Sequence, residues 1–197
     1  MQVKDKFLEK VNVLILVLSL CFSHNLFAQN IYEKIFNYNS TLKNSSANFI
    51  QTHDNYLQEG IIFFGDKRIK IVYTKPEHIT IILSEKKGIY TNHKLKESQF
   101  FATKNSYIKF FFDVFHKVRA LENINIEESK YKIEINEKIK LDDIFYNIKL
   151  VYENEPINLR RLEIINKEAK IQMGFFSYIF HQNFEKDFFS MIDPYLN

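Results

Sequence analysis

The residue types that most often carry chemistry are scattered along this 197-residue sequence. Its 6 histidines include no pair at the i, i+4 spacing with which a helix presents two ligands to zinc. The carboxylate doublets at 127–128 and 142–143 would point to opposite faces of a strand, so they do not pair as an acid and a base. The sequence has no glycine-rich phosphate loop and no serine in a nucleophile elbow. We therefore expect no metal, no cofactor and no catalytic residue, and a binding role rather than an enzymatic one.

The composition indicates one globular domain with an aromatic core. Hydrophobic residues make up 46% of the chain, with 20 Phe and 11 Tyr, and there are only 4 Gly and 3 Pro. The net charge is only +3, and lysines and glutamates are interspersed along most of the chain, as on solvated faces. Nucleic-acid binding usually requires a concentrated basic stripe, and the sequence has none. We expect no nucleic acid among the partners.

Residues 1–28 have the pattern of a cleaved signal peptide. Lys4, Lys6 and Lys10 give a positive start, and 11–22 form an apolar run that is short for a membrane span. Cleavage after Ala28 would leave 29–197 as a single exported domain without cysteine, whose core must hold without disulfides. The segment ending in Cys21 also faintly resembles a lipoprotein cleavage box, which would leave a lipid-modified cysteine instead.

The elements that must position any binding residues are mainly strands. Apolar residues at helical spacing predict amphipathic helices over 30–43 and 103–121, and charges in the second exclude a membrane span. Between and after these helices, alternating apolar residues and polar turns predict closely spaced antiparallel strands. The predicted strands cover 47–51, 57–64, 69–73, 78–83, 88–92, 131–135, 144–152, 159–165, 171–180 and 188–192.

A sheet of this length must twist and curl. The predicted fold class is α+β: a half-open, strongly curved antiparallel β-barrel of about 10–11 strands, with helices covering the concave face. Several strands are apolar on both faces, as in 61–64. Such strands either pack on both sides or form the wall of an apolar cavity, and the pattern alone leaves both alternatives open.

Several short motifs occur in a fixed order along the chain. Ala47-x-Phe49-x-Gln51 is followed by Gln58-Glu59-Gly60, by the basic pair Lys67-Arg68 and by Tyr73-x-x-Pro76. The strand Ile81-Ile82-Leu83-Ser84 and the ending Phe189-x-x-Ile192-Asp193-Pro194 continue the series. Together these motifs resemble the LolA family of periplasmic lipoprotein carriers, over essentially the whole mature chain. The sequence departs from the family pattern at Ile69, which stands where relatives often have proline, and it lacks tryptophan.

The resemblance implies a monomeric periplasmic protein whose apolar interior holds the acyl chains of lipoproteins beneath a helical lid. Its partners would be acylated lipoproteins, the inner-membrane ABC transporter that releases them and an outer-membrane lipoprotein acceptor. By position in the family-like strands, the predicted acyl-chain cavity residues are Phe49, Ile62, Phe64, Ile71, Tyr73, Ile81, Leu83 and Ile89.

The resemblance also implies a lid with a basic latch. Phe111 and Phe115 are the predicted lid contacts, and Arg68 is the arginine expected to hydrogen-bond to the backbone of the lid. Lys70 is the alternative for this arginine role, because counting back from Tyr73 gives a second basic match. Two other function classes stay open: a related lipid-binding or envelope-sensing module on the same fold, and a secreted hydrolase with an unrecognised site.

Overall fold

The computed structural model describes residues 31–53, 56–104, 108–109, 112, 115, 124–141, 143–167 and 169–196. The predicted signal peptide at 1–28 lies outside the described residues, as does Phe111. No helix in the described ranges is long and apolar enough to cross a membrane.

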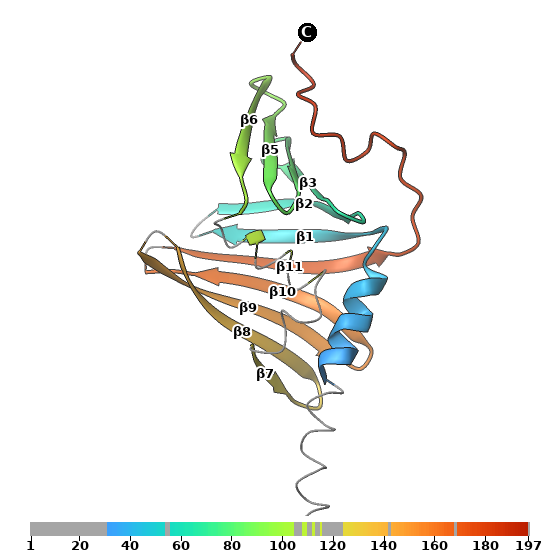
Figure 1. The fold of residues 1–197 in the computed structure, drawn as a ribbon, viewed down its shortest axis with the longest axis vertical. Coiled ribbons are helices and arrows are strands. Elements are labelled where there is room, and N and C mark those ends of the chain that lie inside the picture. The colour runs from blue at the N-terminus through green and yellow to red at the C-terminus, as the bar shows by residue number, and fades with distance from the viewer. Residues whose placement is uncertain are drawn as a thin grey trace, which may run out of the picture.

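The described residues form an 11-stranded sheet in which every neighbouring pair of strands is antiparallel. Figure 1 shows this sheet as a strongly curved surface with a helix against one face. The curved 11-stranded sheet confirms the predicted half-open barrel. The strands are β1 (Ser45–His53), β2 (Tyr56–Phe64), β3 (Ile69–Lys75), β4 (Ile79–Leu83), β5 (Lys87–Asn92), β6 (Glu97–Ala102), β7 (Asn125–Glu128), β8 (Lys132–Leu141), β9 (Ile144–Asn154), β10 (Ile157–Ile165) and β11 (Lys170–Ile179).

The strand order explains why the barrel stays half open. The order is β6-β5-β4-β3-β2-β1-β11-β10-β9-β8-β7, so the first strand pairs with the last in the middle of the sheet. β6 and β7, which follow each other in the chain, lie at the two opposite edges. The barrel is therefore open between β6 and β7, and the 103–124 connection that joins these edges falls largely outside the described residues.

Residues 31–41 form the predicted N-terminal helix and pack on the concave face of the sheet. Ile31, Ile35, Tyr38 and Leu42 are all buried, as their helical spacing predicts. The Tyr38 ring meets the Tyr152 ring edge-on, with ring centres 5.8 Å apart. The Leu159 N–H donates to the Tyr38 hydroxyl at 2.9 Å, which ties the helix to β9 and β10.

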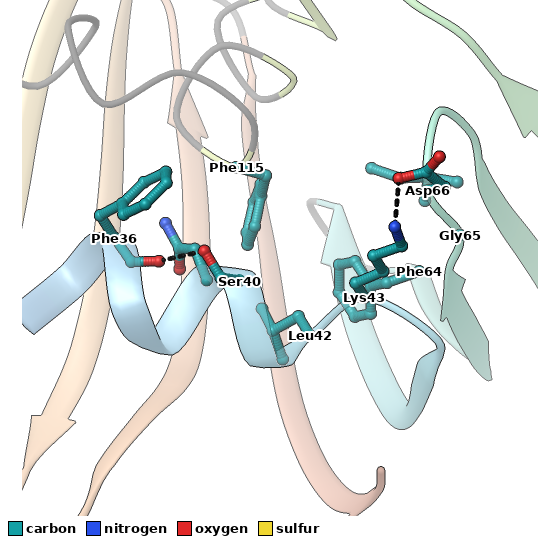
Figure 2. Close-up of a pocket in the computed structure, with 10 residues that line it drawn as sticks. Phe36, Ser40, Leu42, Lys43, Phe64, Gly65, Asp66 and Phe115 are labelled. Atoms are coloured by element: carbon teal, nitrogen blue, oxygen red, sulfur yellow. Dashed lines mark hydrogen bonds and ion pairs between the residues drawn. The ribbon is translucent and has the colours of Figure 1, made fainter. Parts of the chain in front are cut away.

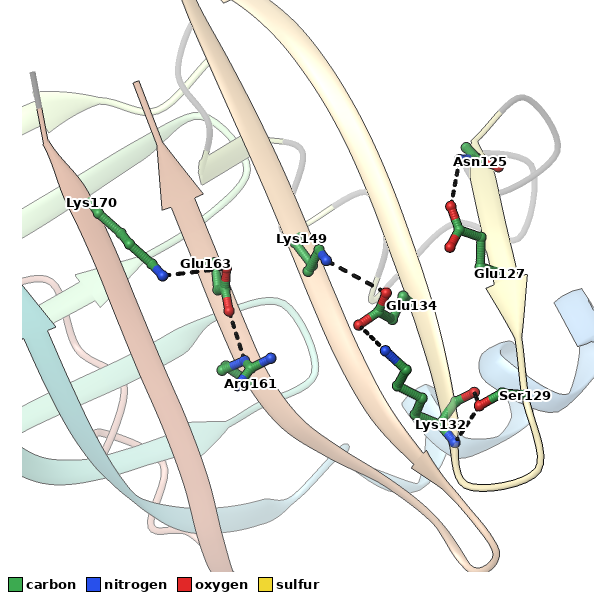
Figure 3. Close-up of polar contacts among 9 residues, drawn as sticks. All are labelled: Asn125, Glu127, Ser129, Lys132, Glu134, Lys149, Arg161, Glu163 and Lys170. Carbon is green, nitrogen blue, oxygen red and sulfur yellow. Dashed lines mark hydrogen bonds and ion pairs between the residues drawn. The ribbon is translucent and has the colours of Figure 1, made fainter. Parts of the chain in front are cut away.

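The convex face of β8–β11 carries charged side chains in alternation with the buried ones (Figure 3). Glu134 lies 3.0 Å from the Lys132 ammonium and 3.5 Å from that of Lys149. Glu163 lies 2.8 Å from the Arg161 guanidinium and 4.0 Å from the Lys170 ammonium. On this half of the convex face the two glutamates are therefore largely covered, while their lysine partners Lys132 and Lys170 are exposed.

The predicted strand over 188–192 is wrong. The segment 180–196 forms turns instead, with backbone hydrogen bonds from Phe188 N–H to the Glu185 carbonyl and from Ser190 N–H to the Asp187 carbonyl. Its aromatic side chains pack on the convex face of the other half of the sheet, where Phe63 of β2 contacts both Phe184 and Phe188. Figure 1 shows this C-terminal segment leaving β11 and running beside β2–β5. We call residues 180–196 the C-terminal strap.

Candidate ligand-binding cavity

An apolar cavity of about 500 Å³ lies inside the half-barrel. Its lining side chains come from both halves of the sheet, namely β1–β6 on one side and β9–β11 on the other. None of the 15 lining residues is charged. They are Gln51, Ile62, Ile71, Tyr73, Ile81, Leu83, Tyr90, Gln99, Phe101, Ile108, Ile148, Leu162, Ile164, Ile171 and Met173.

Strand alternation and register build the two walls. In the first wall Ile62 is paired with Ile71, and Ile71 with Ile81, across three adjacent strands. In the second wall Ile171 is paired with Ile164, which is paired with Ile148. Because paired residues point to the same face of a sheet, each row presents a continuous aliphatic surface to the interior.

The N-terminal helix packs against a different part of the barrel interior from the cavity. The helix contacts β9 and β10 near Tyr152 and Leu159. Ile148 and Ile164 lie further along these strands, beyond the reach of those contacts, and they line the cavity instead. Among the described residues, the larger cavity therefore lies towards the end of the barrel that is away from the helix.

The polar lining groups are neutral. Gln51 is 9% exposed, and its side-chain carbonyl accepts a hydrogen bond from the Tyr73 hydroxyl at 3.0 Å. The Gln51 amide N–H donates to the side-chain carbonyl of Gln58 at 3.0 Å. Gln99 is exposed on the edge strand β6.

The sequence-predicted cavity residues divide into three groups. Ile62, Ile71, Tyr73, Ile81 and Leu83 line the cavity. Residues 49 and 64 are buried in the core beside it. The residue at 89 lies on the opposite, convex face, in a small cluster with the side chains of 82 and 191.

Ile89 therefore does not share a wall with the other predicted residues. Its paired neighbour is Ile82, and the residues next to these two, Tyr90 and Ile81, are the ones that face the cavity. Alternation fixes which residues share a face but not which face is concave, so an isoleucine on either side of these strands looks the same in the sequence.

The Phe49 ring occupies space that is open because residue 60 is a glycine. It lies directly opposite Gly60, and a methyl group added at Gly60 would come within 2.7 Å of the Phe49 ring and would also collide with the Val72 carbonyl. The Phe49 ring packs edge-on against Tyr73, with ring centres 5.2 Å apart. Phe49 thus supports the cavity wall from behind Tyr73.

Phe64 and Phe115 meet at a second, smaller pocket of about 190 Å³ (Figure 2). Their ring centres are 5.6 Å apart. The pocket lies between the end of the helix and the turn after β2, where the Lys43 ammonium pairs with the Asp66 carboxylate at 2.7 Å. The predicted lid contact Phe115 is thus packed against the barrel core.

Both basic latch candidates contact the C-terminal strap. The Arg68 guanidinium donates to the Phe189 carbonyl at 2.5 Å. The Lys70 ammonium donates to the Phe188 carbonyl at 3.1 Å and lies 4.0 Å from the centre of the Phe188 ring. Burial lowers the pKa of Lys70. The described partner of Arg68 is therefore the strap rather than the predicted lid.

Several cavity residues were not predicted from the sequence. β9–β11 supply Ile148, Leu162, Ile164, Ile171 and Met173, and the edge strand β6 supplies Gln99 and Phe101. The clean alternation of 144–152 was visible and could have indicated Ile148. Their place opposite the first wall depends on the pairing of β1 with β11, for which the sequence has no local signal.

The histidines that the structure describes show no metal centre. His78 and His93 stack with ring centres 4.2 Å apart, and His93 hydrogen-bonds to the Thr80 and Tyr195 hydroxyls at 2.8 and 2.9 Å. Burial, and then the charges of His78 and Lys70, lower the pKa of His93. Within the described ranges no group of three His, Cys, Asp or Glu side chains could hold a metal ion.

One solved structure supports the fold, and two others are similar at lower TM-scores. An uncharacterized conserved protein from Thermus thermophilus superposes with a TM-score of 0.52 over 85% of this chain and 96% of its own, at 6% identity. A putative outer membrane lipoprotein-sorting protein domain from Vibrio parahaemolyticus gives 0.46 over 79% and 94%, at 9% identity. LprF from Mycobacterium bovis gives 0.40 over 77% and 92%, at 10% identity. Neither family models nor curated protein sequences match the chain.

Proposed function

We propose that this protein binds the acyl chains of lipoproteins in its barrel cavity and carries them across the periplasm. The observation that supports the proposal is the cavity of about 500 Å³, which is lined from both halves of the sheet and has no charged residue among its described lining residues. Its volume falls within the roughly 300–1,000 Å³ range of small-molecule sites, and its side chains are mainly aliphatic.

The energetics suit a carrier. Each methylene that leaves water contributes ~0.8 kcal/mol, so a chain with a dozen buried methylenes gains on the order of ten kcal/mol. A lipoprotein released from a membrane needs such a cover to cross an aqueous compartment. The carrier itself performs no covalent step, which agrees with the proposal that the protein is not an enzyme.

The cellular setting belongs to the same proposal. The signal-peptide pattern at 1–28 and the LolA-like motifs favour the periplasm, with 29–197 as one carrier domain. The inner-membrane ABC transporter would load the cavity and the outer-membrane acceptor would empty it. A related lipid-binding or envelope-sensing module on the same fold is the alternative, since one fold can serve several functions.

Release of lipoprotein from inner-membrane vesicles tests the carrier role. The purified mature protein is added to vesicles that contain the ABC transporter, a diacylated lipoprotein and ATP, and the vesicles are then sedimented. We expect the lipoprotein in the soluble fraction, bound to the protein, and transfer when acceptor-bearing vesicles are added. The unacylated form of the same lipoprotein serves as the control and should not bind.

The same experiment separates the alternatives. Soluble protein that has taken up phospholipid but no lipoprotein would support the lipid-binding module instead. Lipoprotein that stays entirely with the vesicles, together with a lipid-free protein, would contradict both.

A further inference from the structure

Gln51 is a buried amide in the wall of a mainly aliphatic cavity. It is 9% exposed and lines the cavity beside its cross-strand neighbour Met173 and its hydrogen-bond partner Tyr73. A buried polar side chain normally has its hydrogen-bonding groups occupied, because each unpaired group costs free energy.

The hydrogen bonds of Gln51 leave capacity for a ligand. A glutamine amide has two N–H donors and two acceptor lone pairs. In the described part of the chain, one donor is used by Gln58 and one lone pair by Tyr73. These two bonds fix the orientation of the amide, and one N–H is left for a further acceptor.

Among the described residues that line the cavity, none carries a charge to match an ionised head group. All of its described lining residues are neutral, so no lysine, arginine or histidine among them would neutralise a carboxylate. Moving an unpaired carboxylate into such a site is strongly unfavourable. A neutral carbonyl oxygen, by contrast, can accept the remaining Gln51 hydrogen bond at little cost.

We infer that Gln51 recognises the carbonyl of an ester- or amide-linked acyl chain and sets the preference of the cavity for acyl groups over bare hydrocarbon chains and fatty-acid anions. This inference rests on the proposed function and adds a specificity-determining residue to it. The chain packs on the isoleucine rows, and its carbonyl lies at Gln51.

Three probes that differ at one group test the inference: palmitoyl glycerol, hexadecyl glycerol and palmitate at neutral pH. We expect the ester to bind about five-fold tighter than the ether, the value of one neutral hydrogen bond. Palmitate should bind most weakly. Gln51→Leu should remove the preference for the ester while ether binding persists. Gln172→Leu makes the same chemical change on the outer face of β11, where residue 172 is paired with Glu163, and should keep the preference.

A second measurement uses the unmodified protein, so it does not depend on whether the Gln51→Leu variant folds. Infrared spectra of palmitoyl glycerol with a ¹³C-labelled carbonyl, bound to the unmodified protein, should show the low-frequency band of a hydrogen-bonded carbonyl. A band at the position of an unbonded carbonyl, equal affinities for ester and ether, or tightest binding of palmitate would overturn the inference but leave acyl-chain binding intact. If none of the three probes binds, the proposed function fails together with the inference.

Discussion

At the scale of single residues, two glycines lie under aromatic rings. Gly60 is opposite Phe49, and Gly88 is opposite Phe101 on the neighbouring strand. In both pairs the glycine lets the ring lie flat on the sheet, where a side chain would push it away. Phe101 lines the cavity and Phe49 supports Tyr73, so both pairs shape the binding site.

Gly60→Ala should destabilise the protein by about 3 kcal/mol, because the added methyl group meets both the Phe49 ring and the Val72 backbone. Urea unfolding, followed by far-ultraviolet circular dichroism, measures the change. Gly174→Ala is the matched control, since its methyl group would have no neighbour closer than 3.9 Å. Equal stability of the two variants would show that the Phe49–Gly60 contact is not tight.

Glu134 should contribute stability that depends on pH. The hydrogen bond from Lys132 and the charge of Lys149 lower the pKa of the Glu134 carboxyl, so the folded state favours its ionised form. This contribution is present above the ordinary carboxyl pKa and is lost as the pH falls through the lowered value. Glu134→Gln should therefore lower the free energy of unfolding by about 1 kcal/mol at pH 7 and by progressively less in acid.

Denaturant midpoints of both proteins between pH 7 and pH 3 check this prediction. Glu155→Gln, on the exposed turn between β9 and β10, is the control and should have little effect at either pH. A Glu134→Gln penalty that stays constant down to pH 3 would be inconsistent with a lowered pKa.

At the scale of elements, the C-terminal strap depends on an aromatic cluster. Phe188 stacks on Phe184 at 4.7 Å and packs against Phe63 at 5.0 Å, with the Lys70 ammonium over its ring. Phe188→Ala should loosen the strap and increase amide hydrogen exchange over 184–196, while the protection of β8–β10 stays unchanged. Phe176→Ala, which truncates a 40% exposed phenylalanine, is the control. Unaltered exchange in Phe188→Ala would show that the strap is held by other contacts.

The elements were predictable where local pattern and final packing agree. The N-terminal helix and the strands around 57–64 and 144–152 follow from the spacing of their apolar residues. The edge strands β6 and β7 were missed because an edge needs no regular alternation, and β7 has a single apolar residue, Ile126. Within the strap, 188–192 was predicted as a strand because its apolar residues are dense, yet their side chains pack on the outer face of the sheet instead.

At the scale of the whole molecule, the sequence predicted a curled sheet but left its interior undecided. Strand pairing between β1 and β11 brings together residues more than a hundred positions apart, and this closure sets which isoleucines face each other. In the described part of the chain, the N-terminal helix contacts Tyr152, while Ile148 and Ile164 further along β9 and β10 line the cavity. Such long-range geometry is not encoded in any short stretch of the chain.

A larger side chain in the cavity wall should weaken acyl-chain binding without unfolding the protein. Ile81→Trp places a larger side chain in the first wall. The acyl chain should then bury about two fewer methylene groups, each worth ~0.8 kcal/mol, so we expect roughly tenfold weaker binding of the acyl chain. Ile50→Trp is the control, because Ile50 is 40% exposed and precedes Gln51, whose side chain lies on the other face of β1.

Displacement of an environment-sensitive apolar dye by an N-palmitoyl peptide tests the central claim most directly. We expect the dye to bind the unmodified protein, the palmitoyl peptide to displace it and the unacylated peptide to leave it in place. The Ile81→Trp variant should need about ten times more palmitoyl peptide than the Ile50→Trp variant. A protein that binds neither the dye nor the palmitoyl peptide would contradict the account, because its interior would then offer no room for an acyl chain.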